Sequence, residues 1–292
     1  MGIFQDISMT LKSGIIIACA LSLSGCAPVS ILNNITPSSS FEKTSDVSFG
    51  PGTRDKMDIY RSETSASERP VLVFVHGGSW NSGSKDIYKF LADGFTQIGY
   101  DVVVPNYRLY PDAVFPEFLN DNARAVKSVG DNFPNRPIVL MGHSAGAYNV
   151  LMLGLKDDYL KSVGVDRCTS ISGVVGLAAP TGIIPLDSEP WTTIFPDRFT
   201  GQDAVLNNVS APSPAIFLGH GSEDETVFPQ NSEALAEKVS ARGGKADVKL
   251  YAKQSHSDVV KVLSRHFDGD VSLKADIIDF IETLPSAGNF CQ

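Results

Sequence analysis

Short apolar runs that stop at glycine-containing turns constrain the fold of this chain more than any other feature. Residues 70–75 (PVLVFV) and 137–141 (PIVLM) contain no polar side chain, and they are followed at once by His76-Gly77-Gly78 and by Gly142. Runs of this length are typical of strands buried on both faces of a parallel sheet. The sequence therefore predicts strands that lead directly into glycine-rich turns.

Segments with strand-like and helix-like patterns alternate along the chain. Further strands are expected at 57–60, 100–105, 168–171, 215–218 and 248–251, and helices at 86–98, 115–132, 147–155, 231–242 and 273–284. This alternation predicts an α/β domain with a mostly parallel central sheet and helices on both faces. Ligands of such sheets bind at the carboxyl ends of the strands.

Composition narrows the function classes. The 292 residues carry a formal net charge of −9 and are 42% hydrophobic, which is ordinary for a globular protein with a sizeable core. Phosphate binding relies on clustered Lys and Arg, so the acidic balance argues against a nucleic-acid partner. No H-E-x-x-H and no G-x-G-x-x-G after a strand occurs, so no metal and no cofactor is implied.

The segment Gly142-His143-Ser144-Ala145-Gly146 matches G-x-S-x-G between a predicted strand and a predicted helix. In that context the pattern is typical of a nucleophile elbow, where a serine stands on a sharp turn and glycines allow close backbone approach. Ser144 is therefore the predicted nucleophile. His143 lies inside the elbow and is interpreted as a packing residue.

A serine nucleophile needs a base, and the base needs an orienting acid. In the α/β-hydrolase fold, which this elbow resembles, the acid and then the histidine follow the serine along the chain. His256 comes directly after the strand predicted at 248–251 and is the predicted base. His266 lies in an expected helix and is interpreted as a solvent-facing residue.

The acid is expected in the segment after the strand at 215–218, where Glu223, Asp224 and Glu225 compete. The segment His220 to Val227 resembles the H-G-x-x-D-x-x-V pattern of many α/β-hydrolases, and this resemblance implies that Asp224 is the acid. His220 is interpreted as a support for the loop. Asp258 lies close to His256 in the sequence and is a competing carboxylate.

The turn His76-Gly77-Gly78-Ser79-Trp80 follows the first long apolar strand. In this fold the oxyanion hole takes one N–H from this loop and one from the residue after the nucleophile. Gly77 or Gly78, together with Ala145, is therefore predicted to hold the oxyanion. A tight turn that simply needs glycine is the alternative.

Together these segments are similar to the HGG-type carboxylesterases of the α/β-hydrolase family, near hormone-sensitive lipase and the feruloyl-esterase-like group. The matching segments are HGGSW (76–80), VVVPNYRLYP (102–111), GHSAGAYN (142–149), GHGSEDETV (219–227) and the HSD around His256. The resemblance implies an α/β-hydrolase fold over residues 46–292 and hydrolysis of a small-molecule ester through an acyl-enzyme. Residues 176–210 are irregular and are expected to form either a small cap or a surface loop.

Alternatives to the ester remain open at this point. An amidase, a formamidase like kynurenine formamidase, or a peptidase would use the same triad. A catalytically silent surface binding module is the alternative from another class, although such a module has no need to keep all three catalytic residues.

The N-terminus differs from the rest of the chain. Residues 13–25 (SGIIIACALSLSG) hold no charge, and this run is shorter than the ~20 apolar residues that span a bilayer. It predicts a secretory signal peptide over residues 1–25, starting at Met1 or Met9. Leu23-Ser24-Gly25-Cys26 resembles the lipobox of bacterial lipoproteins, which implies cleavage before Cys26 and a membrane-embedded lipid on it. An ordinary signal peptide or a buried helix is the alternative.

The resemblance to lipoproteins also implies a location in the bacterial cell envelope, on the outer membrane by analogy, since Ala27 rather than Asp follows the cysteine. Residues 26–45 are rich in Ser, Pro, Asn and Thr and are predicted to form a flexible tether. In an oxidising compartment Cys168 and Cys291 would either pair or remain as two thiols.

Overall fold

The computed structural model describes residues 26–182, 189–196, 201 and 203–291, and, within helix α1, the side chains only from residue 31 onward. The predicted signal peptide, residues 1–25, lies outside the described part. In the described ranges we find no helix of the length and apolarity that a bilayer crossing requires.

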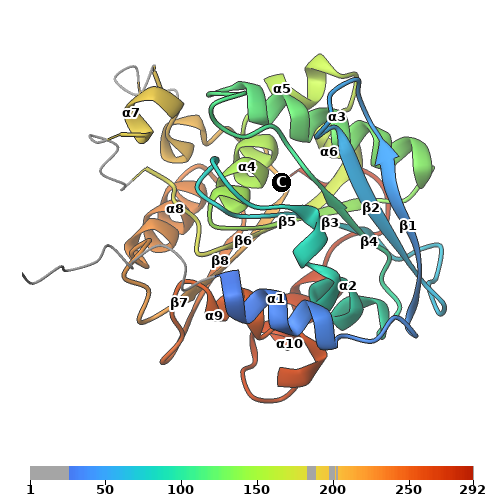
Figure 1. Ribbon diagram of the computed structural model, residues 1–292. Coiled ribbons are helices and arrows are strands. Elements are labelled where there is room, and N and C mark those ends of the chain that lie inside the picture. Colours follow the sequence, from blue (N-terminus) through green and yellow to red (C-terminus); the bar gives the residue numbers. More distant parts are fainter. Residues whose placement is uncertain (1–25, 183–188, 197–200, 202, 292) are drawn as a thin grey trace, which may run out of the picture.

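The centre of the fold is an eight-stranded sheet with the order β1-β2-β4-β3-β5-β6-β7-β8 (Figure 1). Strand β2 runs antiparallel to both of its neighbours, and the remaining neighbours pair in parallel. The predicted mostly parallel sheet is thus confirmed. The strands are β1 (Phe41–Ser48), β2 (Lys56–Ser62), β3 (Val71–Val75), β4 (Val102–Pro105), β5 (Ile138–His143), β6 (Ile171–Leu177), β7 (Ala215–Gly221) and β8 (Ala246–Tyr251).

Helices cover both faces of this sheet, as the alternation predicted. Alternate side chains of β3 divide between two cores: Val71, Val73 and Val75 belong to one, and Leu72 and Phe74 to the other. The first core includes α3 (Glu117–Asn132), α4 (Ala145–Leu155), α5 (Asp158–Ser162) and α8 (Gln230–Ser240). The second includes α1 (Cys26–Ile35), α2 (Lys89–Thr96), α9 (Asp258–Lys261) and α10 (Leu273–Glu282), which lie in the lower part of Figure 1.

The prediction of a flexible tether over residues 26–45 is corrected by the structure. Strand β1 begins at Phe41 and pairs with β2, and Phe41 packs edge-on against Tyr60 with ring centroids 5.0 Å apart. Before it, Asn33 of α1 donates to the Asp86 carbonyl (2.9 Å) and accepts from Lys89 N–H (2.7 Å). The polar composition was misleading because β1 is an edge strand, whose side chains are mostly exposed.

The strand predicted at 168–171 is also displaced. Residues Arg167–Ser170 form the short helix α6, and β6 starts only at Ile171. The Asp166 side chain accepts a hydrogen bond from Thr169 N–H at 3.0 Å, and this cap stabilises the helical turn. Strand β6 ends at Leu177, so the segment that was expected to be irregular from residue 176 begins inside this strand.

The rest of that segment lies partly outside the described residues. Its described part contains α7 (Trp191–Ile194), and Phe195 follows with almost no exposed surface. Phe195 packs on Trp80 and Phe118, with centroids 4.8 and 5.8 Å apart. This part of the segment thus belongs to the core of the domain, and a cap over the site remains a prediction.

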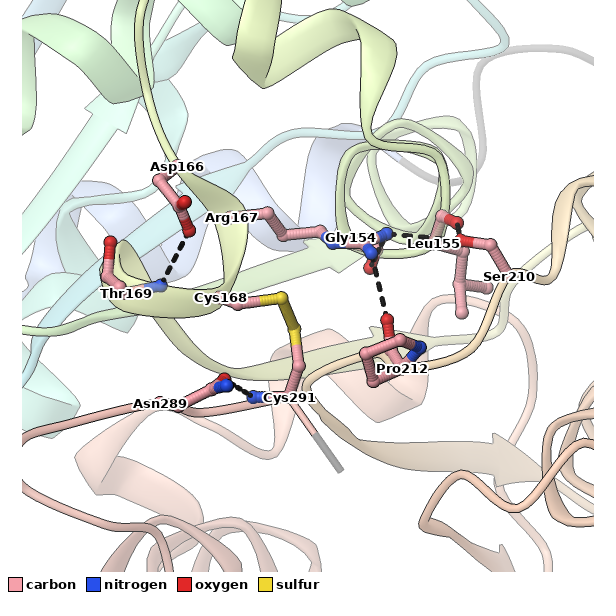
Figure 2. The surroundings of a disulfide bond; sticks show 10 residues. All are labelled: Gly154, Leu155, Asp166, Arg167, Cys168, Thr169, Ser210, Pro212, Asn289 and Cys291. Carbon is pink, nitrogen blue, oxygen red and sulfur yellow. Dashed lines mark hydrogen bonds between the residues drawn. A yellow bond between two sulfur atoms is a disulfide. The ribbon is translucent and has the colours of Figure 1, made fainter.

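Cys168 of α6 and Cys291 near the C-terminus form a disulfide, with Cα atoms 5.0 Å apart (Figure 2). The surrounding contacts hold the tail in the same place. Phe290 N–H donates to the Cys168 carbonyl at 2.6 Å, and Cys291 N–H donates to the Asn289 side chain at 3.0 Å. Of the two alternatives left open by the sequence, the structure has the paired one.

Replacing Cys291 with serine is expected to lower the free energy of unfolding by about 3–5 kcal/mol, because the bond closes a loop between residues 123 positions apart. Urea unfolding without reductant measures the loss. The double variant Cys168→Ser/Cys291→Ser should lose no more than either single variant, since both remove the same bond. A single variant as stable as the oxidised wild type would contradict the prediction.

Candidate active site

Ser144 stands at a sharp turn between β5 and α4. Its backbone adopts φ 54° and ψ −122°, a conformation that non-glycine residues rarely take. A Cβ atom at Gly142 would lie 2.3 Å from the Gly146 carbonyl oxygen, and one at Gly146 would lie 2.1 Å from the Val75 carbonyl oxygen. Both glycines of the pattern are therefore required by close backbone packing, and the turn presents the serine hydroxyl.

The structure brings the three predicted catalytic residues into one hydrogen-bonded chain. Ser144 Oγ lies 2.9 Å from Nε2 of His256, and Nδ1 of His256 lies 2.8 Å from Oδ2 of Asp224. Asp224 follows β7 and His256 follows β8, so both lie where neighbouring parallel strands end. With Nδ1–H donated to the carboxylate, the lone pair of Nε2 is directed at the serine hydroxyl.

The Asp224 carboxylate is buried and surrounded by hydrogen-bond donors. Burial alone would raise the pKa of Asp224, but hydrogen bonds from His220, His256 and the Val227 N–H outweigh it and hold the pKa well below its usual range. Oδ1 accepts from the N–H groups of Thr226 and Val227, each at 2.9 Å. Asp224 is therefore ionised throughout the neutral range and can stabilise a protonated His256.

The other residues that the sequence offered for the acid and the base lie outside the hydrogen-bonded chain of Ser144, His256 and Asp224. Glu223 and Glu225 are exposed. Asp258 accepts from the Ser255 N–H at 2.9 Å and pairs with Lys261, so it organises the loop beside His256. His266 is exposed in the short 3-10 helix η4 (Arg265–Phe267).

The loop after β3, residues 76–80, lies directly against Ser144, and we call it the oxyanion loop after the role predicted for it. A Cβ atom at Gly77 would lie 3.2 Å from Ser144 Cβ, and Gly78 has φ +122°, where a Cβ atom would lie 2.2 Å from the Ser82 carbonyl oxygen. Within the described ranges the N–H groups of Gly77 and Gly78 have no protein acceptor. Ala145 is the first residue of α4, whose initial N–H groups have no partner within the helix. These donors can hold a developing oxyanion.

Residues outside the predicted site fix this loop. Tyr107 donates its hydroxyl to the His76 carbonyl at 2.9 Å, and its ring stacks on the His76 ring at 4.5 Å. Arg54 donates Nε to the Tyr107 carbonyl at 2.7 Å and a terminal N–H to the Gly83 carbonyl at 2.9 Å. Tyr107 lies in the segment 102–111 that resembles carboxylesterases, but the resemblance implied no role for it. No pattern in the sequence pointed to Arg54.

A cavity of about 200 Å³ opens beside Ser144 and His256. It lies between the oxyanion loop and the segment after His256, and its apolar wall includes Ile87, Tyr88 and Val260. Such a wall suits an apolar substituent of a substrate. In the described part of the chain no cluster of three or more His, Cys, Asp or Glu side chains could hold a metal ion.

Two buried histidines are expected to make the fold sensitive to acid. Burial first, and then neighbouring charge, lowers the pKa of His143 to about 3 and that of His76 to about 4. Both would titrate near 6.5 in the unfolded chain, so below that value the unfolded state binds more protons than the folded state. Stability should therefore be complete above pH 7 and fall by about 2 kcal/mol per histidine at pH 5.

Urea unfolding at pH 7.5 and pH 5 measures this loss. The variant His143→Gln cannot take up the proton and should lose about half as much as the wild type between the two pH values. Equal stability of the wild type at both values would contradict the prediction.

The strand order, the serine turn and the chain of Ser144, His256 and Asp224 define an α/β-hydrolase fold with a serine-centred site. The BD-FAE family model matches residues 57–239, and the chain belongs to this family. The matched region begins in β2 and ends in α8, so it contains Ser144 and Asp224, and His256 lies after it.

Two relatives match the chain at low sequence identity. The chain is 26% identical over 238 residues to isoprenylcysteine alpha-carbonyl methylesterase of Arabidopsis thaliana, covering 72% of this chain and 56% of that protein. It is 26% identical over 226 residues to kynurenine formamidase of Danio rerio, covering 75% and 76%. The chain thus spans little more than half the length of the methylesterase.

Among solved structures, an inhibited esterase B from Lactobacillus rhamnosis superposes with a TM-score of 0.73 at 16% identity, covering 88% of this chain and 91% of that one. At this identity the likeness concerns the fold. It confirms the α/β-hydrolase fold predicted from the sequence.

Proposed function

We propose that this protein hydrolyses carboxylic esters through an acyl-enzyme. Ser144 attacks the ester carbonyl while His256 takes the serine proton, and Gly77, Gly78 and Ala145 hold the oxyanion. His256 then returns the proton to the departing alcohol, which leaves the acyl group on Ser144. A water molecule activated by His256 releases the acid. The observation that carries this proposal is the hydrogen-bonded chain from Ser144 Oγ through His256 to Asp224, at 2.9 and 2.8 Å.

Two further observations favour an ester as the substrate. The cavity beside Ser144 has an apolar wall, which suits the alkyl or aryl part of a small ester. The methylesterase and esterase B, to which the chain is similar, carry ester hydrolysis in their names.

Hydrolysis of a formamide is the second candidate. It is favoured by the similarity to kynurenine formamidase, which extends over three quarters of both chains, a larger share of the relative than for the methylesterase. The same residues would act, with an aromatic amine as the leaving group.

A comparison of kcat/KM among different substrates separates these candidates. The purified protein is assayed with p-nitrophenyl esters of short and medium acids, with an N-formyl aromatic amine and with aminoacyl anilides, and a fluorophosphonate probe reports the nucleophile. We expect the highest kcat/KM with an ester and labelling of the wild type. A higher value with the formamide would favour the second candidate. No turnover and no labelling would indicate a binding module.

We also propose that the mature chain begins at Cys26 and is held in the bacterial envelope, on the outer membrane, by a lipid on that cysteine. The charge-free run 13–25 and the segment Leu23-Ser24-Gly25-Cys26 support this proposal. The disulfide between Cys168 and Cys291 supports it as well, because disulfides persist in oxidising compartments.

Membrane fractionation of cells that express the full sequence tests the anchor. The wild type should partition with membranes and incorporate a labelled fatty acid, and Cys26→Ala should do neither. A Cys26→Ala chain that remains with the membranes and matches the wild type in label would overturn the proposed anchor.

A further inference from the structure

His143, interpreted from the sequence as a packing residue, contacts the catalytic base itself. It is the last residue of β5, directly before Ser144, and its side chain is almost completely buried. Its Nε2 lies 2.8 Å from the main-chain carbonyl oxygen of His256, and the two rings have centroids 4.9 Å apart. His143 also borders the cavity beside Ser144.

The direction of this hydrogen bond follows from the chemistry of its partners. Burial, with the neighbouring His256, lowers the pKa of His143 to about 3, so the ring is neutral at neutral pH and carries one N–H. A carbonyl oxygen only accepts, so the proton must be on Nε2. Nδ1 is on the side of the oxyanion loop, 3.1 Å from where a Cβ atom of Gly77 would lie.

The base depends on such a contact because it stands in a connecting segment. Residues 252–257 link β8 to α9 outside any helix or strand, and the side chain of His256 is 19% exposed. Asp224 holds the ring at Nδ1, and Asp258 holds the preceding Ser255 N–H, but neither of these contacts fixes the peptide group that carries the His256 carbonyl. Among the described residues, His143 is the donor that contacts the His256 carbonyl oxygen.

We propose that His143 is a positioning residue for the catalytic base: by donating Nε2–H to the His256 carbonyl, it keeps the His256 ring within reach of the Ser144 hydroxyl. The role rests on the serine-hydrolase mechanism proposed above. His143 precedes Ser144, so one short segment carries the nucleophile and also holds the base that activates it. The neutral ring adds no positive charge beside His256 when that residue becomes protonated during the reaction.

His143 is not an alternative base. The Ser144 hydroxyl lies 2.9 Å from Nε2 of His256, and Oδ2 of Asp224 accepts from Nδ1 of His256 rather than from His143. A base without an orienting carboxylate would also lack the stabilisation that a protonated imidazole requires.

Two substitutions separate positioning from packing. His143→Met fills a similar volume without a donor, and His143→Gln places an amide N–H near the position of Nε2. We expect His143→Met to lower kcat by about 10- to 100-fold with KM nearly unchanged, since a displacement of about 1 Å at a catalytic group has this effect. The rate of fluorophosphonate labelling should fall in parallel, and His143→Gln should recover most of both losses.

Thermal unfolding of all three proteins accompanies the kinetics. Unchanged kcat and labelling rate in His143→Met would overturn this inference, and labelling of the wild type would leave the proposed function standing. Equal losses in the Met and Gln variants, matched by equal decreases in Tm, would also overturn it in favour of packing. A wild type that is not labelled would overturn the proposed function and this inference with it.

Discussion

Replacing Ser144 with alanine is expected to lower kcat for ester hydrolysis by about 10⁵- to 10⁶-fold, the scale on which removal of a triad nucleophile acts. The variant lacks the oxygen that forms the acyl-enzyme, and the oxyanion donors of Gly77, Gly78 and Ala145 can then assist only direct attack by water. KM should change little, because the apolar wall of the cavity is unaltered. Steady-state kinetics with a p-nitrophenyl ester measure both values.

The fold should tolerate this change. Alanine meets the same backbone restriction as serine at φ 54°, so the strain of the turn is carried equally by both residues. Thermal unfolding within a few degrees of the wild type is the control. Fluorophosphonate labelling of Ser144→Ala at the wild-type rate would show that the nucleophile lies elsewhere.

Much of this site could be predicted from the sequence because of where the apolar runs stop. Strands buried on both faces need continuous apolar residues, so β3 and β5 could be predicted from their apolar runs. The residues just after these strands were then expected at the carboxyl edge of the sheet. His256 was preferred to His266 for the same reason, because it comes directly after a strand, whereas His266 was expected in a helix. The acid was found from a resemblance, because three adjacent carboxylates give no local signal that one is buried.

The N-terminal part of the domain escaped prediction for a physical reason. Strand β1 is an edge strand with exposed, polar side chains, and its position depends on backbone pairing with β2. Such pairing leaves no apolar periodicity in the sequence. Helix α1 is likewise placed by side-chain contacts of Asn33 with residues more than fifty positions away.

Contacts between distant residues explain the remaining omissions. Arg54 reaches the oxyanion loop through the Tyr107 and Gly83 carbonyls, and His143 reaches the His256 carbonyl 113 positions later. Each contact forms only after the sheet is assembled. The reacting groups could be predicted from the sequence, but the residues that position them could be identified only from contacts in the folded structure.

Replacing Asp224 with asparagine is expected to lower kcat by about 10⁴-fold with the fold retained. The carboxylate fixes Nδ1–H of His256, and an amide can instead turn its NH₂ group toward the ring and favour the tautomer with its proton on Nε2. That tautomer cannot accept the proton of Ser144. The N–H groups of Thr226 and Val227, which donate to Oδ1 in the wild type, favour this orientation, because they need the amide oxygen as their acceptor.

Glu225→Gln is the matched control, since it removes the same charge one position away from an exposed side chain. We expect its kcat and KM to stay within about twofold of the wild type, because exposed charges are well screened by solvent. Kinetics of the two variants at pH 7.5, with circular dichroism to compare their folds, separate the acid from its neighbours. If Asp224→Asn remained fully active while Glu225→Gln lost activity, the orienting acid would be Glu225, and the chain of hydrogen bonds through Asp224 would not be the one that drives the reaction.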